Sequence, residues 1–130
     1  NGFSADDAIQ LSHDLTLTNG GVIGGGGGGG GAAESTEPGD EAFANGGGGA
    51  GYVVGYGTSP ADDGTLEVGG NGETDGIAAG GEGGDLGQSG YAGIGNITGS
   101  GGAAGLAIDK NGYTLTQTIT GSDIRGNVIP

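Results

Sequence analysis

The feature that most constrains this chain is an unbroken run of eight glycines, Gly24–Gly31, directly after Val22 and Ile23. Glycine loses more conformational freedom on folding than any other residue, so such a run resists order unless neighbouring chain holds it in place. Glycine is also abundant elsewhere, at 39 of 130 residues, whereas hydrophobic residues make up only 32%. The chain has too few bulky apolar side chains for an ordinary core, so its fold has to use glycine itself.

Downstream of Val68 the glycines recur at every third residue. Eight of the nine positions in this register between 81 and 105 are glycine, and Asn96 is the exception. A period of three fits neither the α-helix nor the β-strand, but it fits the polyproline-II helix, which has no internal hydrogen bonds. Such helices can pair their backbone groups laterally only where the touching faces carry no side chains. The register therefore predicts a bundle of polyglycine-II helices, packed as a sandwich.

The two kinds of glycine segment fit different places in this bundle. A peripheral helix needs glycine only at every third residue, and residues 81–105 fit that role with Glu82, Asp85 and Gln88 facing solvent. A helix surrounded on all sides has room for glycine alone, so we expect Gly24–Gly31 to be enclosed, with no space for any side chain. At ~3.1 Å per residue, eight glycines span roughly 25 Å. The predicted structural glycines are Gly24, Gly27, Gly30, Gly81, Gly84, Gly87, Gly90 and Gly93.

Strand patterns lie at both ends of the chain. Apolar residues occupy odd positions from Ile9 to Leu17, a two-residue period that only His13 interrupts. Near the other end, Asn111-Gly112 between two apolar stretches predicts a β-hairpin. The predicted fold is mostly irregular and all-β, with a polyglycine-II bundle, a few flanking strands and essentially no α-helix. Its parts are an N-terminal strand region (1–23), the bundle (24–105) with loop inserts at 34–45, 52–68 and 71–79, and a C-terminal β-hairpin and tail (106–130).

Charge and composition exclude several classes of partner. The formal net charge is −14, and Lys110 and Arg125 are the only Lys or Arg residues. Nucleic acids and anionic membrane surfaces attract basic proteins, so we expect neither as a partner. No apolar run approaches the ~20 residues of a membrane helix, and membrane insertion is not expected. The chain has no cysteine, which leaves no disulfide and no thiolate metal site.

Motifs that resemble catalytic or metal sites have simpler explanations. The glycine run formally satisfies G-x-G-x-x-G, but no helix or βαβ unit follows it. His13 beside Asp14 lacks a recognisable nucleophile, and a histidine on the polar side of a strand explains it better. The stretch Asp109–Gly112 lacks the remaining ligands of a calcium loop, and acidic pairs such as Asp62-Asp63 are interpreted as solvated charge. We therefore predict no enzyme, no cofactor and no metal site.

Several stretches resemble glycine-rich phage tail proteins, which include tail-fibre tip adhesins and the distal ends of tail-tip host-specificity proteins. These stretches are Gly101–Ile108, Asn111–Thr114 and Gly121–Gly126, while Leu15–Ile23 running into polyglycine is similar to the start of the same modules. The resemblance implies that the glycine segments form a polyglycine-II scaffold. It also implies that the loops between them contact a bacterial outer-membrane protein or surface glycan.

Aromatic and apolar residues of the loops are the candidates for that contact. Tyrosine is a common anchor of interfaces, and the valines next to Tyr52 and Tyr56 would add an exposed apolar patch. A second interpretation stays open, because a protein without an oily core also needs aromatic side chains to seal its ends. The predicted receptor-binding residues are Phe43, Tyr52, Val53, Val54, Tyr56 and Tyr91.

The sequence thus predicts a non-enzymatic receptor-binding module, an adhesin, at the tip of a phage tail. Its expected partners are a bacterial outer-membrane protein or surface glycan and other tail proteins, and a homo-oligomer such as a trimer is left open. The alternative is a structural subunit of an extracellular filament or coat, whose strand-bearing ends would pair between subunits. Ice binding is a third interpretation, but the many acidic residues argue against the uncharged face that it requires.

Overall fold

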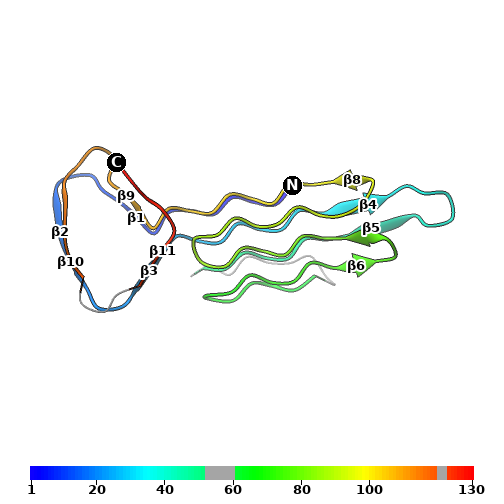
Figure 1. Cartoon of the computed structure of the whole chain (residues 1–130), viewed down its shortest axis with the longest axis horizontal. Helices are drawn as coiled ribbons and strands as arrows, with labels where there is room; N and C mark the ends of the chain where they lie inside the picture. The colour runs from blue at the N-terminus through cyan, green and yellow to red at the C-terminus, as the bar shows by residue number, and fades with distance from the viewer. Residues whose placement is uncertain (52–60, 120–122) are drawn as a thin grey trace.

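The computed structural model describes residues 1–51, 61–119 and 123–130. The molecule is elongated and has three regions along its length (Figure 1). Strands from both ends of the chain wind around each other at one end, extended glycine segments run through the middle, and short hairpins close the other end. The described residues contain no α-helix, as the sequence predicted.

The middle region is held together by backbone hydrogen bonds that recur at every third residue. Residues 1–8 illustrate the pattern, since Gly2, Ala5 and Ala8 each donate to a carbonyl of residues 100–106, at 2.7 to 3.0 Å. The amides of the residues between these donors do not bond to the same neighbour. The segment is therefore not a sheet strand, in which every second amide would bond to one neighbour. Residues 1–8, placed by the prediction in a strand region, therefore lie alongside the glycine segments.

The glycine run 24–31 is at the centre of this region. From Gly26 to Gly31 its successive amides donate in rotation to three neighbouring segments, the Gly25 amide donates to Arg125, and the carbonyls of the run accept from two further segments. In order around the run, the described neighbours are residues 1–8, 99–105, 88–93, 81–87 and 46–51, and each of these segments also hydrogen-bonds to the next one in this order.

Close packing explains why these positions are glycine. At seven of the eight predicted structural glycines, a Cβ atom would collide with a backbone atom of another segment, for example the Gly84 carbonyl oxygen at Gly27. At Gly24 it would meet the Leu86 side chain at 3.2 Å. Gly29 is the least crowded position of the run, since the nearest atom to an added Cβ would be the Phe3 amide nitrogen at 3.3 Å.

At one end, two passes of the chain form stacked turns of a parallel β-coil. The first pass contains β1 (Ile9–Gln10), β2 (Leu15–Asn19) and β3 (Val22–Gly24), and the second contains β9 (Ile108–Asp109), β10 (Leu115–Ile119) and β11 (Asp123–Arg125). Each strand of the second pass pairs in parallel with its counterpart in the first, and β12 (Val128–Ile129) begins a third turn on β9. The coil buries Leu11 and Ile108.

Two local predictions for the coil are wrong. Asn111 and Gly112 do form a turn, with positive φ angles of 48° and 81°, but the strands β9 and β10 on either side do not pair with each other. The turn makes a corner of the coil instead of a hairpin, because parallel pairing with the first pass satisfies both strands. The predicted strand around His13 is likewise broken at a bend between β1 and β2, where the His13 ring contacts the Ser12 hydroxyl at 3.1 Å.

The other end of the molecule carries the hairpins. An antiparallel sheet has the order β5 (Ala42–Ala44), β4 (Ala33–Ser35), β8 (Ile97–Thr98), and the shorter hairpin of β6 (Thr74–Asp75) and β7 (Ala78–Ala79) lies beside it. Inserts 34–45 and 71–79 of the prediction are therefore ordered hairpins at the same end (Figure 1). The inner face of the sheet is made of small residues that pack tightly, and the buried cluster there consists of Ala33, Ala42, Ala44 and Ala78.

Candidate binding surface at the hairpin end

The outer face of the hairpin sheet carries a row of three exposed side chains. Phe43 on β5 and Ile97 on β8 are both directly opposite Glu34 on the middle strand β4. Directly opposite residues in a sheet project from the same face, so the three side chains form one row. Phe43 is 54% exposed and Ile97 is 57% exposed, although both are large and apolar. We call Phe43, Glu34 and Ile97 the outer row.

Two further apolar side chains are exposed at this end of the molecule. Ile77 lies in the turn between β6 and β7, and Ile94 pairs with Ala79 of β7 through an isolated bridge with hydrogen bonds of 2.7 and 2.8 Å. Scattered apolar residues are ordinary on protein surfaces, but several at one end indicate a surface for contact with another molecule.

Asn96 fixes the loop of β8 to the hairpin that carries Phe43. Its Oδ1 atom accepts hydrogen bonds from the Ser35 hydroxyl at 3.1 Å and from the Thr36 amide at 3.2 Å, while its Nδ2 group donates to Glu37 at 3.2 Å. Asn96 is also the position that breaks the threefold glycine register. The break is explained by this role, because the chain has left the glycine segments there and needs a side chain.

Acidic side chains tie the second hairpin to the first by accepting backbone hydrogen bonds. Glu73 accepts from the Asn45 amide at 3.0 Å and from its side-chain Nδ2 at 2.7 Å, and Asp75 accepts from the Phe43 amide at 3.2 Å. The Phe43 main chain is thus held on both sides by fixed partners. Carboxylates of the 71–79 insert therefore position the outer row.

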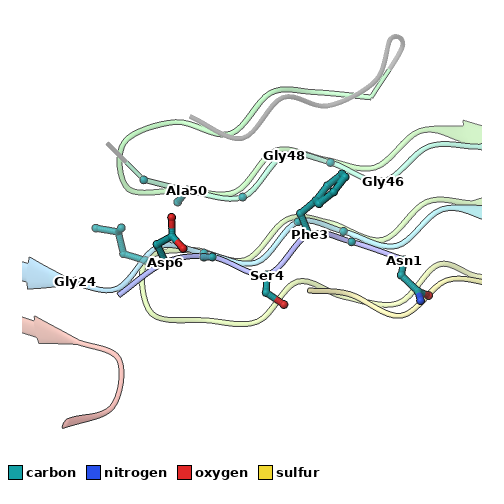
Figure 2. A pocket seen from close by; sticks show the side chains of 18 of the residues that line it. Asn1, Phe3, Ser4, Asp6, Gly24, Gly46, Gly48 and Ala50 are labelled. Carbon is teal, nitrogen blue, oxygen red and sulfur yellow. The ribbon is translucent and has the colours of Figure 1, made fainter. Parts of the chain in front are cut away.

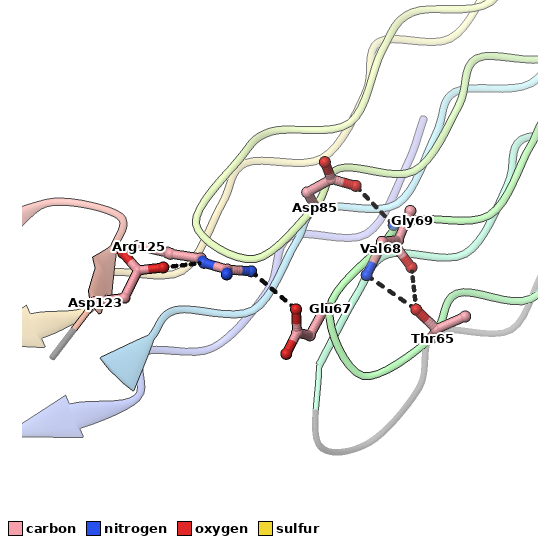
Figure 3. Close-up of polar contacts among 7 residues, drawn as sticks. All are labelled: Thr65, Glu67, Val68, Gly69, Asp85, Asp123 and Arg125. Carbon is pink, nitrogen blue, oxygen red and sulfur yellow. Dashed lines mark hydrogen bonds and ion pairs between the residues drawn. The ribbon is translucent and has the colours of Figure 1, made fainter. Parts of the chain in front are cut away.

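The end of the glycine region next to the coil has a different character, since the ion pair between Arg125 and Glu67 joins it to the coil. Arg125 of β11 donates from Nε to Asp123 at 2.8 Å and from Nη1 to Glu67 at 3.2 Å (Figure 3). The hydrogen bond with Asp123, and then that with Glu67, raises the pKa of Arg125 above its usual value. Thr65 closes the adjacent turn by bonding to Val68, and Asp85 accepts from the Gly69 amide.

The predicted receptor-binding residues fall into two groups. Phe43 and Tyr91 are exposed, on β5 and on the segment 88–93 respectively. Tyr52, Val53, Val54 and Tyr56 lie outside the described residues. Sequence reasoning missed Ile77, Ile94 and Ile97, although the loss of glycine at Asn96 marks the point where that loop leaves the threefold register.

The described residues contain no group of three or more His, Asp or Glu side chains that could hold a metal ion. Helices long and apolar enough to cross a membrane are likewise missing from the described part of the chain. What the structure presents is a scaffold paired through its backbone, with exposed apolar side chains at the hairpin end and others in and next to the coil.

Comparison with known proteins gives the family. Residues 1–129 match the family described as phage tail fibre adhesin Gp38, and the chain belongs to that family. It is also similar in structure to the crystal structure of the gp37–gp38 adhesin tip complex of the bacteriophage S16 long tail fibre, with a TM-score of 0.67 and 30% sequence identity. That match covers 98% of this chain and 51% of the S16 chain, so the chain spans about half the length of the protein it matches. No curated protein matches the sequence.

Family membership confirms the prediction of a phage tail fibre adhesin. It also selects the adhesin over the alternative of a filament or coat subunit. The scaffold and the outer row are therefore parts of a phage tail fibre adhesin.

Proposed function

We propose that the glycine segments form a bundle of polyglycine-II helices, and that this bundle is a stiff support for the adhesin's binding surface. The observation that carries this proposal is the spacing of the lateral hydrogen bonds, because one donor in every three reaches the same neighbour. Three residues per turn is the geometry of the polyproline-II class of helix. A circular dichroism spectrum of polyproline-II type is expected, and a spectrum dominated by β-sheet would contradict the proposal.

The receptor-binding surface is the hairpin end, with the outer row at its centre. Phe43 and Ile97 supply apolar contact area, and the ordered partners of Asn96 and Asp75 hold them in place before binding. Fixed anchors of this kind lower the entropy cost of association. The surface is also acidic, since every Lys and Arg of the chain lies at position 110 or beyond. The receptor is therefore a bacterial outer-membrane protein or surface glycan with an apolar site bordered by positive charge.

Binding of the labelled protein to a panel of bacterial strains tests this assignment. In the strain that binds most protein, Phe43→Ser with Ile97→Ser is expected to weaken binding roughly tenfold or more, as loss of interface anchors does. The matched control is Leu66→Ser with Val68→Ser, because these two residues are 61% and 54% exposed but lie in the turn next to the coil. Loss of binding in the control pair alone would place the receptor site at the other end of the molecule.

Electrostatics gives a second test of the same surface. Attraction between the acidic hairpin end and a basic receptor patch is screened by salt, so binding should weaken as the ionic strength rises. Binding that is insensitive to salt would remove positive charge from the description of the receptor.

The adhesin is carried on the fibre by another tail protein. In the S16 structure the adhesin tip is a complex of gp37 and gp38, and a fibre protein of the gp37 kind is the corresponding partner here. Co-expression with the tail-fibre protein of the same phage, followed by affinity purification, is expected to recover the pair. A homo-oligomer such as a trimer remains a prediction, which native mass spectrometry would test.

A further inference from the structure

The central glycine run has one open side. Its five described neighbours form an unbroken series of hydrogen-bonded segments from 1–8 round to 46–51, but no hydrogen bond joins those two terminal segments within the described residues. Between them lies a groove of about 730 Å³, lined largely by backbone. In a lattice of threefold helices each enclosed helix has six neighbours, so the groove is the sixth position.

Unpaired backbone groups mark the same position. Within the run, the carbonyls of Gly25, Gly26, Gly28, Gly29 and Gly31 each accept an amide hydrogen bond. Those of Gly27 and Gly30 accept none from the described residues, and they lie close to the backbone of Gly49 and Gly46. Backbone acceptors in packed regions are normally paired. The missing donors are spaced three residues apart, which is the spacing that a further threefold helix would supply.

Two side chains of the 1–8 segment also lack partners beside this groove. Phe3 is 89% exposed, more than any other large apolar residue described, and its ring extends from the segment toward Gly46 and Gly48 (Figure 2). The Asp6 carboxylate extends the same way toward Ala50 and makes no hydrogen bond or ion pair with the described residues. An apolar ring and a free carboxylate thus stand over the groove.

From these observations we propose that the groove binds one extended, glycine-rich strand of a partner polypeptide, which completes the lattice. The strand donates amide hydrogen bonds from every third residue to Gly27 and Gly30. The partner strand needs glycine at the positions that touch the run and favours a basic side chain beside Asp6. The Phe3 ring covers the bound strand. This inference rests on the polyglycine-II bundle proposed above but is independent of the receptor site.

Binding of synthetic peptides to the purified protein tests the proposal. The probe is an acetylated, amidated octapeptide of glycine with lysine at its third and sixth positions, and the control peptide has alanine in place of every glycine. The glycine peptide is expected to bind and the alanine peptide to bind at least tenfold more weakly, because methyl groups cannot enter the lattice. Equal binding of the two peptides, or no binding of either, would overturn the proposal.

Variants of the protein locate the binding. Gly29→Leu places a side chain in the groove, and Gly29 is chosen because an added Cβ there lies 3.3 Å from its nearest atom, the farthest in the run. The variant should abolish peptide binding. Thr16→Leu, on an exposed position of β2, is the matched control and should leave peptide binding unchanged. If Gly29→Leu fails to fold, Phe3→Ala provides the test and should weaken binding several-fold. Peptide binding that survives both changes would contradict the assignment.

A second copy of the chain is the competing occupant. If the protein forms dimers at assay concentration and Gly29→Leu abolishes them, two copies fill each other's grooves. That result would overturn the proposal that a partner polypeptide supplies the strand. Binding to bacterial cells provides the link to the receptor proposal. Gly29→Leu should retain cell binding, whereas Phe43→Ser with Ile97→Ser should retain peptide binding, so the two proposals fail separately.

Discussion

The same two passes of chain run side by side through both the glycine region and the parallel β-coil, yet they pair differently in each. In the glycine region, residues 1–8 bond to 100–106 through every third amide. A few residues later, β2 pairs with β10 in continuous register, from Leu15 opposite Leu115 to Asn19 opposite Ile119. The change follows the sequence, because glycine and alanine give way to alternating apolar and threonine residues.

The comparison shows two ways to organise a chain with little apolar material. In the coil, side chains from stacked turns bury one another, as Leu11 and Ile108 do. In the glycine region the backbones themselves are in contact, and hydrogen bonds and close packing replace the oily core. The glycine region therefore has little room for added atoms, least of all at positions such as Gly27, while the coil loses stability when buried atoms are removed. The predictions below test this difference.

The largest effect is expected for an added side chain in the glycine region. Gly27→Val would place its Cβ against the Gly84 carbonyl oxygen, and neither backbone can move without breaking bonds to further segments. We expect a loss above ~4 kcal/mol, an exceptional value for one substitution and a large part of a typical domain's stability. Urea denaturation measures this loss.

Gly29→Val is the internal control for that change, since it lies two residues away in the same run. The nearest atoms to its Cβ would be the Phe3 nitrogen at 3.3 Å and the Phe3 oxygen at 3.7 Å. The loss should stay within ~1–3 kcal/mol, as for moderate overpacking. Equal losses at the two positions would mean that glycine propensity, not enclosure, determines the stability of the run.

The next effect is expected where the coil loses atoms. Ile108→Ala removes the largest fully buried side chain described and leaves a cavity between stacked turns. The expected loss is about 2–5 kcal/mol. Hydrogen exchange should show faster opening of β1, β9 and β12 than of the glycine region. Uniform acceleration across both regions would show that they unfold as one unit and would weaken the comparison.

Much of this organisation could be predicted from the sequence, because glycine spacing reflects which faces touch. Steric exclusion is a local rule, so candidate structural glycines can be named from the sequence one position at a time. The three-residue spacing of Gly81 and Gly84, for example, follows from their close approach to the segment 88–93, at Tyr91 and Gln88. Strand pairing is not local. The Asn111-Gly112 turn indicated a hairpin, but nothing within that stretch shows that β9 and β10 each pair with residues about 100 positions earlier.

The candidate surface was predicted only in part for the same reason. Phe43 was identified as a lone aromatic residue in a loop. Its neighbour Ile97 lies 54 positions away in sequence and reaches the same face only because β4 pairs with both β5 and β8. The open side of the glycine run could not be predicted either, because a run of identical residues does not reveal how many neighbours surround it.

A smaller effect is expected at the side chain that joins two hairpin-end loops. Asn96→Ala removes three hydrogen bonds to residues 35–37, and each is worth roughly 0.5–1.5 kcal/mol, less where solvent can replace the partner. We expect a loss of about 1–2 kcal/mol together with faster amide exchange in residues 33–44. Exchange in the coil should not change. Loss of receptor binding without a matching loss of stability would show that Asn96 also orders the outer row.

The smallest effect is expected at the two ion pairs of Arg125, of which the one with Glu67 joins the coil to the glycine region. Arg125→Gln removes the contacts with Asp123 and Glu67, which are half exposed, and exposed pairs contribute little to stability. The raised pKa of Arg125 means that its stabilising contribution is complete below its usual pKa and lost only as pH rises through the folded value. The titration of Arg125 therefore does not change the stability of the protein between about pH 6 and 9.

Salt should diminish the difference in melting temperature between Arg125→Gln and the parent protein, because screening acts on exposed charges. A difference in melting temperature that persists in high salt would mean that the Arg125 side chain stabilises the protein by packing and not by charge.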